Sequence, residues 1–122
     1  MVSMHWNDAT PIYRQLRDRV VAMILDGVLK PGDSLPSVRQ VAADFQINPI
    51  TVSKAYQQLV DEELVEKRRG LGMFVSEGAP AQLLKSERQH FLEEEWPLVR
   101  ERIERLGLSV EELLEQNEEE RQ

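Results

Sequence analysis

Apolar residues in the first part of the chain recur in steps of four and three, the spacing of one face of a helix. They are Ile12, Leu16, Val20, Met23 and Ile24. Thr10 and Pro11 precede them and are suited to be the cap and the first helical residue, and Gly27 follows as a stop. The pattern therefore predicts a helix from residue 11 to the glycine.

Two shorter helices are predicted next, joined by a break of about four residues. The first begins at Ser37, with Gln40 completing a capping box, and the second begins at Asn48 and Pro49, a cap followed by a first helical residue. Their apolar faces contain Val38, Val41, Ala42 and Phe45, then Val52, Ala55, Tyr56 and Leu59. The opposite, mostly polar side of the second helix contains Ile50, Lys54, Gln57 and Asp61. Such a pair is a helix-turn-helix.

Two β-prone runs, residues 64–68 and 73–76, flank a turn that contains Gly70 and Gly72. Short strands around a glycine-containing turn predict a β-hairpin. A helix-turn-helix followed by a hairpin is the winged-helix arrangement. The expected fold is therefore mainly α with a small β-hairpin wing, followed by a short C-terminal helical region.

Residues 82–105 are helical by pattern, and Pro97 either kinks this helix or starts its second half. Gly107 interrupts the pattern, and Ser109 with Glu112 caps a final short helix. An apolar stripe follows these helices. It consists of Leu84, Phe91, Leu92, Trp96, Val99, Ile103, Leu106, Val110 and Leu113. Because so short a helix pair has too little core of its own, the stripe must pack either on its own winged helix or on a second copy.

The net charge of the 122-residue chain is -7, which taken alone argues against a nucleic-acid partner. Its location changes that interpretation. Residues 1–78 hold nine lysines and arginines against ten acidic residues, a net of -1, whereas residues 79–122 hold six against twelve, a net of -6. We expect two parts: a winged helix-turn-helix, the form of a DNA-binding domain, at 1–78 and a helical tail at 79–122, whose stripe is a candidate dimerisation surface.

The chain resembles the GntR family of bacterial transcription regulators, and within it the YtrA subfamily. The resemblance rests on residues 11–16 (Pro-Ile-Tyr-Arg-Gln-Leu), 35–39 (Leu-Pro-Ser-Val-Arg), 48–56 (Asn-Pro-Ile-Thr-Val-Ser-Lys-Ala-Tyr) and 68–75 (Arg-Arg-Gly-Leu-Gly-Met-Phe-Val). It covers the first two-thirds in detail and the tail by length and pattern. Gln46 and Glu63 stand where the family usually has glycine. The resemblance implies a homodimeric repressor on a palindromic operator.

Ten residues are expected to contact double-stranded DNA. They are Arg39, Asn48, Pro49, Ile50, Thr51, Ser53, Lys54, Arg68, Arg69 and Gly70. The start of the recognition helix is the end that enters the major groove, and exposed Ile50 would touch a thymine methyl. The resemblance implies that Arg39 contacts a phosphate or base and that Arg69, at the wing tip, contacts the minor groove or phosphates.

Other function classes fit the sequence less well. The chain has no cysteine, no nucleophile–base constellation and no phosphate-binding loop, so we expect neither an enzyme nor a cofactor. His5 and His90 each lack a second ligand at metal spacing. The chain has no membrane segment or export signal, so a cytoplasmic protein is expected. The alternative function is a winged-helix protein–protein interaction module without specific DNA binding.

Regulation by a ligand is left open by the sequence. Larger members of the resembled family carry a separate effector domain, for which the 44 residues of the tail are too few. Any small-molecule effector would have to bind at the dimer interface or between tail and winged helix. Phe91 and Trp96, near the centre of the tail, prompt this hypothesis.

Overall fold

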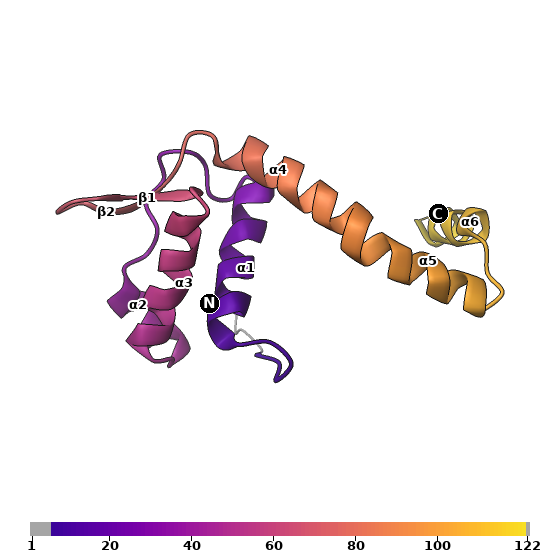
Figure 1. Ribbon diagram of the computed structural model, residues 1–122, viewed down its shortest axis with the longest axis horizontal. Helices are drawn as coiled ribbons and strands as arrows, with labels where there is room; N and C mark the ends of the chain where they lie inside the picture. Colours follow the sequence, from indigo (N-terminus) through magenta and orange to yellow (C-terminus); the bar gives the residue numbers. More distant parts are fainter. Residues whose placement is uncertain (1–5, 122) are drawn as a thin grey trace. The chain divides into compact units, whose positions relative to one another are not determined.

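The computed structural model describes residues 6–121, with side chains for residues 6–116 (Figure 1). His5 lies outside the described residues. The chain divides into two units, one ending at Leu84 and one beginning at Lys85. The elements in order are α1 (Ile12–Leu25), α2 (Val38–Phe45), α3 (Pro49–Asp61), β1 (Val65–Arg68), β2 (Gly72–Val75), α4 (Ala79–His90), a π-helical turn (Phe91–Glu95), α5 (Trp96–Arg105) and α6 (Val110–Arg121). The expected fold class, a mainly helical winged helix with a two-stranded wing and a C-terminal helical region, is confirmed.

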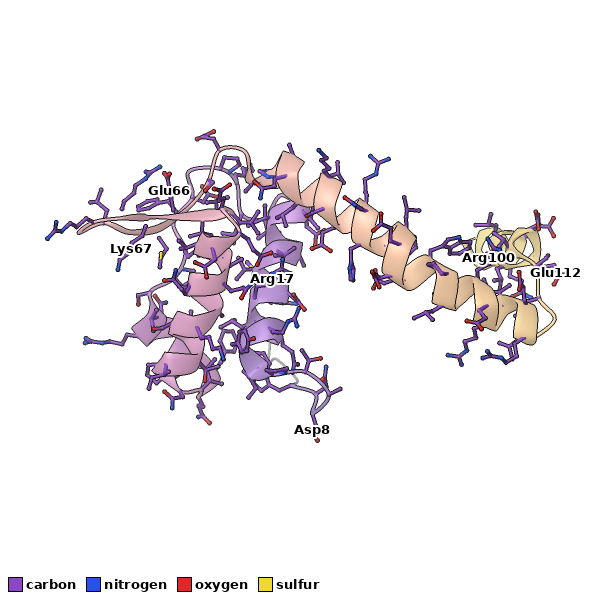
Figure 2. All side chains as sticks on the ribbon, viewed as in Figure 1. Asp8, Arg17, Glu66, Lys67, Arg100 and Glu112 are labelled. Carbon is purple, nitrogen blue, oxygen red and sulfur yellow. The ribbon has the colours of Figure 1, made fainter. Side chains whose placement is uncertain are left out.

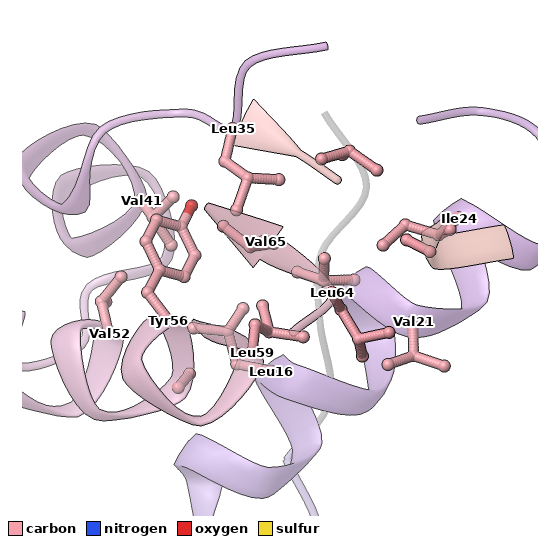
Figure 3. Close-up of a cluster of buried hydrophobic side chains, with 14 of the residues drawn as sticks. Leu16, Val21, Ile24, Leu35, Val41, Val52, Tyr56, Leu59, Leu64 and Val65 are labelled. Atoms are coloured by element: carbon pink, nitrogen blue, oxygen red, sulfur yellow. The ribbon is translucent and has the colours of Figure 1, made fainter. Parts of the chain in front are cut away.

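One hydrophobic core holds the first unit together (Figure 3). Helix α3 is at its centre, since it packs on α1, on α2 and on β1. Val52, Ala55 and Leu59 of α3 have no exposed surface at all. The buried face of α3 is therefore the one that the helical spacing predicts. The opposite face of this helix does not pack in the core.

Two of the three N-terminal caps predicted for the helices of the first unit are observed. Ser37 accepts a hydrogen bond from the backbone N–H of Gln40, and Asn48 accepts one from that of Ile50, so both predicted caps are confirmed. The predicted cap at Thr10 is wrong. Pro11 occupies the cap position without a side-chain bond, and its carbonyl accepts the first amides of α1. The Thr10 amide instead donates to the side chain of Asn7.

Two non-glycine residues lie in the left-handed region of the backbone, Gln46 at the end of α2 (φ 54°) and Glu63 just after α3 (φ 63°). These are the two positions where the resembled family usually has glycine. The conformation costs a residue with a side chain about 1 kcal/mol, and the turn is retained because the flanking helices pack in the core.

The wing is fastened at its base and free at its tip. Val65 pairs with Val75 and Arg68 with Gly72, in antiparallel register. On its other side β2 pairs with the loop before α2, where the Leu35 amide donates to the carbonyl of Met73. The hairpin base is thus held between two neighbours.

The first turns of α4 belong to the core of the winged helix. Ala79 and Leu83 are buried there. The first unit therefore extends six residues past residue 78, where the charge composition of the chain changes. It does so because apolar residues in the first turns of α4 pack in its core.

The second unit has no core of its own among the described side chains. None of those from residue 85 to 116 is buried. Pro97 is the second residue of α5, which agrees with the prediction that it starts the second half of the helix, and a π-helical turn precedes α5. The Trp96 amide donates to the carbonyl of Phe91, five residues back, and this wider turn adapts the helix to a proline that has no N–H to donate. Ser109 caps α6 by accepting from the Glu112 amide.

Candidate nucleic-acid interface

The first turns of α3 present a side that the core does not use. Ile50 is 75% exposed although it is apolar, and Ser53 and Lys54 are exposed beside it. Thr51 is half-buried. An exposed isoleucine next to short polar and cationic side chains matches what major-groove readout needs, an apolar group for a thymine methyl and donors for base edges or phosphates.

Helix α1 helps to position the lysine of this face. The Nζ atom of Lys54 lies 4.2 Å from the centre of the Tyr13 ring, a cation–π contact. Because Tyr13 is on α1, this contact restricts the position of the Lys54 ammonium group relative to a neighbouring helix. This contact reduces the entropy that Lys54 would lose when it binds a phosphate.

The start of α2 lies next to the start of α3. Exposed Arg39 of α2 and Pro49 of α3 line the same shallow groove, together with Val38, Ala42 and Ile47. The structure thus brings Arg39 together with the predicted residues at the start of α3. A single DNA backbone could be contacted by both helices across this groove.

A buried tyrosine fixes the loop in front of α2. The Tyr56 hydroxyl donates to the carbonyl of Pro36 over 2.7 Å. Burial raises the pKa of Tyr56 to about 12, so the hydroxyl keeps its proton throughout the physiological range. The bond therefore holds α2 in place against α3.

The basic residues of the wing fall into two groups. Arg68 is held within the hairpin, since its Nε and a terminal nitrogen donate to Glu66 at 3.0 and 2.7 Å and its guanidinium lies 4.3 Å from the centre of the Phe74 ring. Arg69, at the tip, is exposed and makes no hydrogen bond or ion pair with the described residues. Figure 2 shows Glu66 and Lys67 on opposite sides of the hairpin, as strand alternation requires. The sequence analysis placed Arg69 at the wing tip but did not predict that Arg68 is paired within the hairpin.

Leu71 was missed by the sequence-based prediction of the interface. It is 73% exposed at the wing tip, between Gly70 (φ 78°) and Gly72 (φ 118°). A Cβ added at either glycine would meet nothing within 4 Å, so the tip is narrow and open. The available signal was an apolar residue between two glycines in a predicted turn, where no core could cover it.

The predicted DNA residues all belong to the first unit. In Figure 1 the hairpin projects past α3 on the side where α2 lies, away from α1. Arg17, by contrast, is on α1 and is used internally, because it pairs with Glu62 and Asp18. Its bond with Glu62 raises the pKa of Arg17. Arg17 is therefore committed to contacts within the first unit.

The predicted stripe of the tail is open to solvent. Trp96, Ile103 and Leu113 are half-buried and the other six members are exposed. The Phe91 and Trp96 rings lie 6.5 Å apart and tilted. Three further apolar residues, Leu98, Leu108 and Leu114, are also exposed, and the spacing analysis did not include them.

Other kinds of site receive no support. In the part of the chain that the structure describes, no group of three acidic or histidine residues could hold a metal ion. Nor is any described helix long and apolar enough to cross a membrane.

A helix-turn-helix with an exposed face on its second helix, followed by a two-stranded wing with a basic tip, defines the winged-helix class of DNA-binding domain. Comparison with known proteins narrows this class. The chain belongs to the gntR family of bacterial regulatory proteins, whose model matches residues 12–75. Within the family it is YtrA-like.

Two proteins of Bacillus subtilis show the similarity in sequence. The HTH-type transcriptional repressor YtrA is 42% identical over 85 residues, covering 70% of this chain and 65% of YtrA. The HTH-type transcriptional regulator YhcF is 33% identical over 110 residues, covering 90% of this chain and 89% of YhcF. The chain thus matches just under two-thirds of the length of YtrA and nearly all of YhcF.

A solved structure extends the similarity to the whole fold. The GntR family transcriptional regulator from Listeria monocytogenes is 28% identical, with a TM-score of 0.76, over 93% of this chain and 98% of that one. Since the relatives are named as transcriptional regulators and repressors, and the family binds DNA, the expectation that the protein is not an enzyme is confirmed.

Proposed function

We propose that the protein is a sequence-specific DNA-binding repressor that acts as a homodimer in the bacterial cytoplasm. The observation that carries the proposal is the division of α3 into two sides. One side is completely buried at Val52, Ala55 and Leu59, while the other exposes Ile50 to 75% at the end that a helix-turn-helix inserts into DNA.

The proposed contacts assign a task to each element. The start of α3 reads base edges in the major groove through Ile50, Thr51 and Ser53, and Asn48, Pro49 and Lys54 lie at the flanking phosphates. Arg39 of α2 contacts the backbone from the other side of the shared groove. At the wing, Arg69 and Gly70 approach the minor groove or phosphates, and Arg68 supports the hairpin.

The dimer is assigned to the stripe of the tail. Amphipathic helices without a core need a partner, and a second copy provides an identical stripe. Two-fold symmetry would place two recognition helices on a palindromic operator, with half-sites about one helical turn apart. Any small-molecule effector would act at this dimer interface, near Phe91 and Trp96, where it would change Trp96 fluorescence.

The test is a titration of the 122-residue chain against DNA fragments, including one from its own promoter, at several salt concentrations. A specific complex should weaken as salt rises, with a logarithmic slope of about -0.9 for each phosphate neutralised. Ile50→Ala should lower affinity by about tenfold and relax the preference at one base pair. Val28→Ala serves as the control, since Val28 is also exposed and aliphatic and lies outside the proposed DNA and dimer contacts.

The near-neutral charge of residues 1–78 favours a second function, a winged helix that contacts another protein. In that case the chain would bind its own promoter fragment no better than random DNA, even at low salt. This result would overturn the proposed repressor.

A further inference from the structure

Tyr13, in the first turn of α1, has a half-buried ring and a hydroxyl group that the fold does not use. This hydroxyl makes no hydrogen bond with the described residues. The hydroxyl of Tyr56 on α3, by contrast, donates to the carbonyl of Pro36 over 2.7 Å. A tyrosine at a protein surface can present its apolar ring to a neighbour and its hydroxyl to a ligand. The Tyr13 hydroxyl is therefore an available donor.

The ammonium group of Lys54 is held in place without using its hydrogen-bond donors. Its Nζ atom lies 4.2 Å from the centre of the Tyr13 ring, and Lys54 makes no ion pair or hydrogen bond with the described residues. A cation–π contact depends on the charge of the ammonium group, so the N–H donors stay available. Because α1 packs on α3 within the first unit, the two side chains belong to one packed pair of helices.

The two donors lie next to the side of α3 that is proposed to enter the major groove. Lys54 follows Ile50 by four positions, so the two side chains are neighbours on one face of the helix. With Ile50 at a base edge, Lys54 lies one turn further along, toward the phosphates that border the groove. A cationic donor beside a neutral donor, both without acceptors in the chain, suits an anion with several oxygen atoms. The backbone phosphate of DNA is such an anion.

We propose that Tyr13 is a DNA-binding residue of α1. Its ring positions the ammonium group of Lys54, and its hydroxyl donates a hydrogen bond to the backbone phosphate that Lys54 contacts. The inference rests on the proposed function, which places Lys54 at a phosphate. It adds α1 to the elements that contact DNA, beside α2, α3 and the wing. The contact requires only elements of the first unit, so it forms on a single half-site.

Two substitutions separate the hydroxyl of Tyr13 from its ring. Tyr13→Phe removes only the hydroxyl, whereas Tyr13→Leu also removes the cation–π contact. Half-sites are selected from random DNA with the 122-residue chain, and fluorescence anisotropy then measures affinity for a duplex with one half-site at four salt concentrations. We expect Tyr13→Phe to weaken binding by about fivefold and Tyr13→Leu by about fifteenfold. The salt slope of Tyr13→Phe should equal that of the wild type, because a hydroxyl neutralises no phosphate.

A second substitution, Lys54→Ala, tests whether the ring acts through the lysine. With Lys54 present, Tyr13→Leu should bind about threefold more weakly than Tyr13→Phe. Combined with Lys54→Ala, the two Tyr13 variants should bind equally, because no ammonium group remains for the ring to position. Ile12→Ala is the matched control, since it shortens an exposed apolar side chain in the same turn of α1 and should change affinity by less than about twofold. Urea midpoints confirm that each variant is folded.

The outcomes distinguish this inference from the function on which it rests. If Tyr13→Phe binds as tightly as the wild type, the hydroxyl does not contact the phosphate. If the two Tyr13 variants differ by the same factor with and without Lys54, the ring does not position the lysine. Either result overturns the inference while the repressor stands. If the wild-type chain selects no half-site at all, the proposed function fails and the inference fails with it.

Discussion

The winged helix and the tail use their apolar residues in opposite ways. All sixteen buried apolar residues of the described chain lie between Leu16 and Leu83. From residue 85 to 116 no described side chain is buried, and stripe residues such as Leu92 and Leu106 are 60% or more exposed. The winged helix is therefore stable through its own packing, whereas the tail buries none of its described side chains.

The largest expected effect is a contrast between two leucine truncations. Leu59→Ala removes a side chain with no exposed surface from the centre of the winged helix and should lower the free energy of unfolding by about 3 kcal/mol. Leu98→Ala in the tail should change it by no more than about 0.5 kcal/mol. Urea denaturation at one protein concentration measures both. Equal losses would mean that the two units share one core.

A charge placed on the stripe should separate the copies without unfolding the winged helix. Ile103→Glu would bury a carboxylate in the proposed dimer interface and should weaken self-association by about a hundredfold, as measured by sedimentation equilibrium. The control, Arg102→Glu, introduces the same side chain at an exposed neighbouring position. An unchanged dissociation constant in Ile103→Glu would place the dimer interface elsewhere or exclude a dimer.

Much of this contrast could be predicted from sequence because its causes are local. Caps at Ser37 and Asn48 depend on residues two or three positions away, and the buried side of α3 follows from helical spacing. Gln46 and Glu63 were recognisable as departures from the resembled family, which usually has glycine at both positions.

The remaining features depend on residues far apart in the chain. The bond of Gln82 to Glu62 spans 20 positions, and the pairing of Arg17 with Glu62 spans 45. Arg68 and Arg69 are adjacent and chemically identical, yet only the register of the hairpin places Phe74 under the first. No periodicity encodes such pairings, and the contacts of the ten predicted DNA residues stay a prediction until a complex is tested.

The two wing arginines should differ in DNA binding as they differ in structure. Arg69→Ala removes an uncommitted cation and should lower operator affinity by about tenfold and reduce the magnitude of the salt slope by about 1. Arg68→Ala should affect affinity less, because its charge is already paired with Glu66. Fluorescence anisotropy at four salt concentrations measures both. An Arg68 effect equal to that of Arg69 would mean that DNA displaces Glu66.

The smallest expected effect concerns pH and belongs to the winged helix alone. Burial raises the pKa of Tyr56 from the ordinary 10.0 to about 12, so the folded chain holds this proton more tightly than the unfolded chain does. The resulting stability is present below pH 10 and is lost as pH rises from 10 to 12. Tyr56→Phe should cost about 1 kcal/mol at neutral pH, because the Pro36 carbonyl loses its donor.

The alkaline part of the stability profile should therefore be shallower in Tyr56→Phe than in the wild type. Tyr13→Phe is the matched control, since that ring is only half-buried on α1 and makes no hydrogen bond with the described residues. Urea midpoints between pH 7 and 11.5 give the profiles, and sedimentation in parallel should show self-association unchanged by Tyr56→Phe at pH 7. If stability falls equally steeply with rising pH in all three proteins, the Tyr56 hydroxyl is not held in the core. The bond from Tyr56 to Pro36 would then not anchor α2.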